Sequence, residues 1–118
     1  MYGSLINMMI DNDYHDGQIK VGAGVTELCW SDRHAYFIKD IIKNKKGEVR
    51  QLVLEGAWLK GIGAGYFEVS KDQQEGFFQN RGEMIIKKTR KGNWTSDGTE
   101  KGTKFRIGHA DEYYDITF

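Results

Sequence analysis

The sequence predicts a small all-β domain, and three observations support this fold class. Short apolar segments that alternate with polar residues recur along the chain, aromatic residues make up 13% of it, and glycine occurs 15 times. Proline is absent. Short strands joined by glycine-bearing turns explain this composition better than a helical bundle or a disordered chain. A length of 118 residues suits one domain with a single core.

The first predicted elements form a hairpin after an N-terminal appendage, which covers residues 1–17 and precedes a domain at 18–118. Residues 25–30 form a strand in which Thr26, Leu28 and Trp30 share one face. A polar turn at 31–33 then leads into a second strand at 34–42.

Later segments continue the same alternation. The block at 57–65 holds three glycines, so it is either a curved strand or a loop. The alternation of Met84 and Ile86 marks a further strand, followed by a turn into Trp94. The remaining predicted strands are 49–54, 66–69, 83–89, 105–107 and 113–118.

Five to seven short strands in about a hundred residues must bury alternating faces. Closing a strongly bent sheet removes exposed edges, so we expect a small SH3-like or related barrel. A β-sandwich is the alternative, because strand spacing does not distinguish closure from two stacked sheets. The last segment, with Tyr114, Ile116 and Phe118 at alternate positions, is predicted to be the strand that completes the barrel.

Charge and cysteine content limit the function classes. The formal net charge is zero, so the chain lacks the positive field with which non-specific DNA-binding proteins attract phosphate. The single Cys29 forms no internal disulfide, which favours a reducing cytoplasm. The apolar stretch at 5–10 is too short to span a membrane, so no membrane partner is expected. No metal or other cofactor is expected, because His15, His34 and His109 match no known ligand spacing.

Two parts of the chain resemble one family. The run at 21–36, VGAGVTELCWSDRHAY, resembles the opening of small proteins encoded by phages and prophages. The segments Lys91-Gly92-Asn93-Trp94, 105–108 and 112–118 resemble the ends of the same proteins. The resemblance covers residues 18–118 and implies the cytoplasm of a host cell but no particular activity. Small phage accessory proteins often bind a host protein, a nucleic acid or a signalling nucleotide.

The first candidate site is the turn at Asp32, Arg33 and His34, because loops on a rigid scaffold often carry binding residues. Arg33 and His34 would recognise an anion or a peptide there, with Asp32 orienting them. The alternative is a purely structural turn, in which Asp32 bonds the backbone and Arg33 pairs with a carboxylate.

Two basic clusters form the second candidate site. The first holds Lys43, Lys45, Lys46 and Arg50, and the second holds Lys87, Lys88, Arg90, Lys91, Lys101, Lys104 and Arg106. Trp94 lies beside the second cluster, and an exposed aromatic among cations suits single-stranded nucleic acid or a nucleotide. The alternative is a solvated face, since carboxylates lie among these cations. The acidic Asp111 and Glu112 either meet a basic partner or neutralise Arg106 within the domain.

The sequence therefore favours a non-enzymatic phage accessory protein that binds a host protein, such as a counter-defence inhibitor of a host nuclease or other enzyme. The predicted contact residues are Arg33, His34, Arg90, Lys91, Trp94, Asp111 and Glu112. The alternative function is binding of nucleic acid or a nucleotide through Lys87, Lys88, Arg90, Lys91 and Trp94. A hydrolase that uses His34 or His109 is the least favoured class, and self-association stays open.

Overall fold

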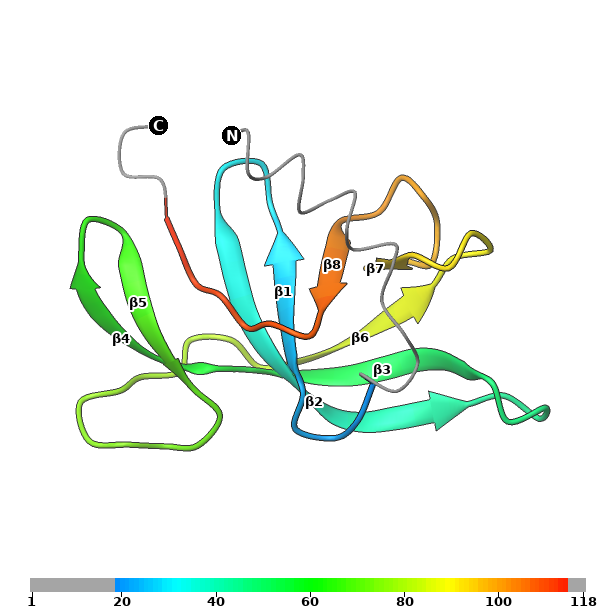
Figure 1. Ribbon diagram of the computed structural model, residues 1–118, viewed down its shortest axis with the longest axis horizontal. Coiled ribbons are helices and arrows are strands. Elements are labelled where there is room, and N and C mark those ends of the chain that lie inside the picture. Colours follow the sequence, from blue (N-terminus) through cyan, green and yellow to red (C-terminus); the bar gives the residue numbers. More distant parts are fainter. Residues whose placement is uncertain (1–18, 115–118) are drawn as a thin grey trace.

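The computed structural model describes residues 19–114, and every regular element in that range is a strand (Figure 1). The predicted appendage at 1–17 and the alternating Ile116 and Phe118 lie outside the described residues. The strands are β1 (Gly24–Leu28), β2 (Arg33–Lys43), β3 (Val49–Gly56), β4 (Trp58–Gly63), β5 (Tyr66–Ser70), β6 (Glu83–Lys88), β7 (Trp94–Thr95) and β8 (Lys104–Ile107).

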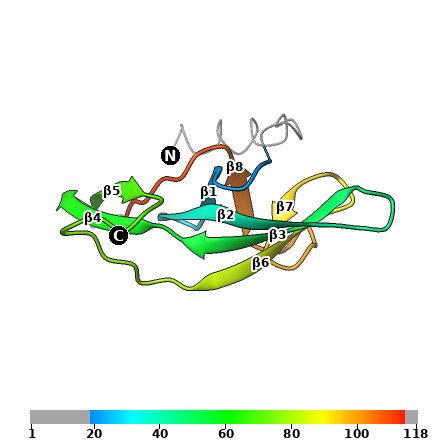
Figure 2. The ribbon, with the colours of Figure 1, turned by 90° about the horizontal axis from the view of Figure 1, so that it is seen from below.

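Six of these strands form a closed antiparallel barrel in the order β1, β2, β3, β6, β7, β8. Closure comes from β8, which pairs with β1 from Val25↔Ile107 to Leu28↔Lys104. The predicted all-β fold with a small closed barrel is therefore confirmed. The other two strands, β4 and β5, form a separate two-stranded sheet beside the barrel (Figures 1 and 2).

Alternation along the strands fills the barrel interior, as the sequence predicts. In β3, Leu52 and Leu54 are fully buried between half-buried neighbours, and Ile86 on β6 is buried while Ile85 faces outward. Period-two burial of this kind is what one core-facing side of a strand produces. The buried cluster consists of Ile19, Val25, Tyr36, Ile38, Leu52, Leu54, Ile86, Trp94, Phe105 and Ile107.

The β4–β5 hairpin is attached to the barrel by a second, smaller cluster. Leu59 is fully buried there with Ala35 and Ala57. Leu59 and Phe78 also exchange two backbone hydrogen bonds, of 2.7 and 2.8 Å. The block at 57–65, which the sequence left open between strand and loop, is thus mainly a strand that ends in a turn. Ala64 occupies that turn with a positive φ of 54°.

The barrel closes without the predicted last strand at 113–118, of which the structure describes only Tyr113 and Tyr114. The closing strand is β8, and Tyr113 instead forms isolated bridges with Arg33 and Tyr66. The buried hydroxyl of Thr26 explains part of this path, because it donates to the His109 carbonyl at 2.7 Å and accepts from the Asp111 N–H at 3.0 Å. These two bonds fix the turn after β8 against β1. Beyond that turn, the chain links the start of β2 to the β4–β5 hairpin.

Candidate functional site

One backbone hydrogen bond and two hydrogen bonds from the Arg33 side chain hold the turn between β1 and β2. The Cys29 N–H donates to the Asp32 carbonyl at 3.2 Å. Arg33 Nη1 donates to the carbonyls of Cys29 at 3.2 Å and Asp32 at 2.9 Å. The Arg33 guanidinium thus crosses the turn and bonds two backbone carbonyls, contacts that the structural alternative did not include. Recognition of an anion by Arg33 and His34 stays a prediction.

Trp30 stands at the tip of this turn with 91% of its surface exposed. The sequence predicts that Trp30 shares a strand face with Thr26 and Leu28. This is wrong for Trp30, because β1 and its alternation end at Leu28. Sequence reasoning therefore placed Trp30 on a strand rather than at a turn tip. The turn-forming triplet at 31–33 is the signal that could have shown its exposure.

Two tyrosines lie near this turn: Tyr66 begins β5, and Tyr113 lies in the segment after β8. Tyr113 bridges both Arg33 and Tyr66, so the three residues lie side by side across adjacent backbones. The rings of Tyr66 and Tyr113 are 4.8 Å apart at their centroids, and Tyr66 is 55% exposed. We call the set of Trp30, Arg33, Tyr66 and Tyr113 the Trp30 surface.

A polar cluster beside this turn consists of Glu27, Cys29 and His34. His34 Nδ1 lies 2.9 Å from Glu27 Oε1 and 3.6 Å from Cys29 Sγ. The His34 ring also packs edge-on against Tyr114, with centroids 5.7 Å apart. Burial, together with the carboxylates of Glu27 and Asp32, raises the pKa of Cys29 to about 11. The thiol is therefore protonated at neutral pH.

Glu112 is a structural residue, in contrast to the predicted solvent-facing contact. Its side chain has no exposed surface and accepts both Nη1 and Nη2 of Arg81 at 2.8 Å. The same carboxylate accepts the Ala35 N–H at 2.8 Å. A fully buried carboxylate needs such partners, so Glu112 is unavailable to a binding protein. Asp111 remains more than half exposed and pairs with Arg106 at 2.7 Å, the internal neutralisation that the sequence allowed.

Trp94 does not provide a stacking surface either, because only 2% of it is exposed. Strand β7 lies between β6 and β8, and its Trp94 points into the barrel core. Arg90 and Lys91 lie on the exposed turn before it, and Lys87 is exposed on β6. The cations of the predicted nucleotide site are thus accessible, but the aromatic residue that was to join them is not.

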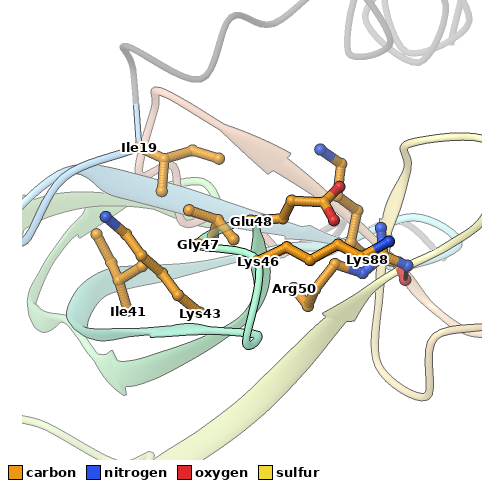
Figure 3. Close-up of a pocket in the computed structure, with 9 residues that line it drawn as sticks. Ile19, Ile41, Lys43, Lys46, Gly47, Glu48, Arg50 and Lys88 are labelled. Carbon is orange, nitrogen blue, oxygen red and sulfur yellow. Dashed lines mark hydrogen bonds between the residues drawn. The ribbon is translucent and has the colours of Figure 1, made fainter.

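A cavity of about 460 Å³ lies beside the β2–β3 hairpin (Figure 3). Ile19, Ile41 and Val49 supply apolar walls. Its charged lining residues are Lys43, Lys46, Glu48, Arg50 and Lys88. Arg50 is oriented by a hydrogen bond of 3.3 Å from its Nη2 to the Lys88 carbonyl. The cavity joins three cations of the first basic cluster to Lys88 of the second, which sequence order alone did not show.

His109, the other histidine of the hydrolase alternative, has an exposed side chain, and His15 lies outside the described residues. Among residues 19–114, no helix is long and apolar enough to cross a membrane. Comparisons of the chain with protein-family models, with curated proteins and with solved structures gave no match.

Proposed function

We propose that this chain is a non-enzymatic accessory protein that binds a host protein through the Trp30 surface. The observation that carries the proposal is the position of Trp30, which is 91% exposed on a turn whose backbone is fixed. Exposed tryptophan on a rigid turn loses little conformational freedom on binding. That combination favours a tight contact with another protein.

The other members of the Trp30 surface, Arg33, Tyr66 and Tyr113, are of residue types common at binding centres. Tryptophan, tyrosine and arginine dominate the residues that contribute most of the energy at protein interfaces. A fully buried tryptophan removes about 150–250 Å² from water, which is worth about 4–6 kcal/mol at about 25 cal/mol per Å². The partner that fits is a folded protein with an apolar pocket for the indole ring and hydrogen-bonding groups for the tyrosine hydroxyls.

The bound chain would block its host protein sterically, as expected of a counter-defence inhibitor of a nuclease or another enzyme. The resemblance of residues 21–36 to small phage proteins supports this setting. Trp94 and Glu112 leave the proposed contact set because both are buried. Arg33 stays in it, and the exposed Trp30 replaces Trp94 as the aromatic anchor.

The proposal is tested by affinity capture from host cells, followed by titration of the purified pair. We expect Trp30→Ala to weaken binding by about 30-fold or more, as loss of 2 kcal/mol or more at a central tryptophan does. Ile85→Ala is the matched control, since Ile85 is an exposed apolar residue on the outer face of β6. Equal binding by wild type and Trp30→Ala would overturn the proposal. Sedimentation showing that Trp30 mediates only self-association would also overturn it.

The cavity at the β2–β3 hairpin favours a second candidate function, binding of a nucleotide or a short single strand. Its volume of about 460 Å³ lies in the range of ordinary small-molecule sites. Lys43, Lys46, Arg50 and Lys88 would pair with phosphate groups, and the apolar walls would contact the rest of the ligand. Binding in this cavity would therefore depend on ion pairs with phosphate, and not on the stacking of a base on Trp94 that the sequence suggested.

Fluorescence anisotropy with labelled oligonucleotides and nucleotides, repeated across a salt series, tests this second candidate. Binding should weaken steeply as salt rises, because each phosphate contact releases counterions. Lys46→Glu should abolish binding, whereas Lys60→Glu makes the same charge change on exposed β4, away from the cavity. Equal effects of the two substitutions would show a non-specific charge effect and exclude the cavity as the site.

A further inference from the structure

We propose that Glu27, Cys29 and His34 form a site for one zinc-like divalent cation. Their ligand atoms, a carboxylate oxygen, a thiol sulfur and an imidazole nitrogen, all lie within 4.8 Å of one another. The site is independent of the proposed protein-binding function. It also departs from the sequence expectation of no metal.

The fold explains why these three residues meet. Glu27 and His34 are direct partners in the β1–β2 register, so their side chains project from the same face of the hairpin. Cys29 lies one residue beyond the end of β1, and its Sγ comes within 3.6 Å of His34 Nδ1. The turn bonds from Arg33 and the Cys29 N–H hold this end of the hairpin in place. The ligands therefore come from a rigid segment.

The distance between the sulfur and nitrogen ligand atoms matches tetrahedral coordination. With Zn–S near 2.3 Å and Zn–N near 2.0–2.1 Å, a tetrahedral angle separates sulfur from nitrogen by about 3.5 Å. The Cys29 Sγ to His34 Nδ1 distance is 3.6 Å. The 2.9 Å between His34 Nδ1 and Glu27 Oε1 is shorter than the matching tetrahedral edge of about 3.3 Å, so the carboxylate must shift by about 0.4 Å. A glutamate side chain makes such a shift by small torsional changes.

The ligand types select the metal. Thiolate and imidazole favour zinc over magnesium or calcium, which prefer oxygen ligands. On binding, the Cys29 thiol releases one proton, and His34 coordinates through neutral Nδ1 with its remaining proton on Nε2. The thiolate and the Glu27 carboxylate then balance the two positive charges of the ion. Three protein ligands leave a fourth position for water or for a side chain of a binding partner.

Cobalt titration of the full chain, first stripped of metal with a chelator, tests the site. We expect one equivalent of Co²⁺ to give a thiolate-to-metal charge-transfer band and the intense visible bands of four-coordinate cobalt, and Zn²⁺ to displace it. Cys29→Ser should abolish the charge-transfer band. Glu27→Gln and His34→Gln should weaken binding by about tenfold or more, a loss at least as large as that from outer-shell substitutions.

The double variant His15→Gln/His109→Gln is the control, because it removes the other histidines and leaves the cluster intact. Circular dichroism in the presence of chelator establishes that each variant is folded, and the isosteric Glu27→Gln keeps the test valid if Cys29→Ser is not. Zinc should also slow alkylation of Cys29 in the wild type. Absence of a thiolate band, failure of zinc to protect Cys29, or loss of binding only in the histidine control would each overturn the proposal.

Discussion

Arg81 and Glu112 show how two side chains far apart in sequence can anchor one region. The bidentate pair links the segment before β6 to the chain after β8, and the Glu112 carboxylate also holds the Ala35 N–H of β2. Arg81 Nη2 donates further to the Tyr114 hydroxyl at 2.7 Å. Burial lowers the pKa of Arg81, but the paired carboxylate outweighs this effect and leaves it above its ordinary value. Arg81 is thus charged, and its pair with Glu112 is structural.

Replacing Glu112 with alanine should destabilise the protein strongly. The substitution leaves a largely buried guanidinium and a buried N–H without this acceptor, at a cost of about 3–5 kcal/mol. Urea unfolding measures the loss. Asp111→Ala breaks the neighbouring ion pair with Arg106, in which Asp111 is exposed. We therefore expect the free energy of unfolding to change by about 1 kcal/mol or less. Comparable losses for the two variants would contradict the structural role of Glu112.

Asp97 provides a pH dependence whose sign follows from its hydrogen bonds. The N–H and the hydroxyl of Thr99 donate to its carboxylate at 2.9 Å and lower the pKa of Asp97 from the ordinary 3.8. Since the folded-state pKa is the lower one, the stabilisation is complete above the unfolded pKa and is lost as pH falls through the folded pKa. The Tm difference between wild type and Asp97→Asn should therefore be largest at neutral pH and shrink in acid. An equal difference at both extremes would refute this assignment.

At the scale of elements, a single glycine lets β3 pass the segment before β6. A Cβ on Gly56 would lie 2.6 Å from both the Cβ and the carbonyl oxygen of Arg81. Something must move at so short a distance, and moving the Arg81 backbone costs more energy than moving the end of a flexible side chain. Gly56 is also where β3 leaves the barrel and the chain turns into the β4–β5 hairpin.

Gly56→Ala should consequently destabilise the protein by about 1–3 kcal/mol, the usual cost of overpacking. Gly82→Ala is the matched control, because a Cβ there meets nothing within 4 Å. That control should be neutral or slightly stabilising, since alanine restricts the unfolded chain. Thermal unfolding of the two variants side by side checks both expectations, and equal destabilisation would show that the close approach is unimportant.

For the whole molecule, barrel closure depends on β8. This strand pairs with both β1 and β7 and supplies Phe105 and Ile107 to the core. A chain that ends at Gly102 should lose the near-ultraviolet circular dichroism of packed aromatic residues and aggregate, because β1 and β7 become open edges. Retention of that signal by the truncated chain would mean that the remaining strands fold without closure.

Much of the architecture could be predicted from sequence because strand alternation and glycine-bearing turns are local signals. They located β2, β3, β6 and β8 to within a few residues, and the predicted alternation of Met84 and Ile86 marked β6. They could not show which of the candidate site residues are exposed. The predicted anchors Trp94 and Glu112 are buried, whereas Trp30 is exposed.

The sequence by itself determined that this protein is a small all-β domain, since period-two alternation specifies strands and their two faces, whereas closure into a barrel depends on the pairing of β8 with β1. Only the tertiary structure decided that the Trp94 side chain faces the barrel core and that β1 ends before Trp30. It also decided which distant residues meet, as Arg81 and Glu112 do. Alternation fixes relative orientation along one strand, but strand ends and partners depend on register across the sheet. The cluster of Glu27, Cys29 and His34 depends on that register too, which is why histidine spacing in the sequence gave no indication of it.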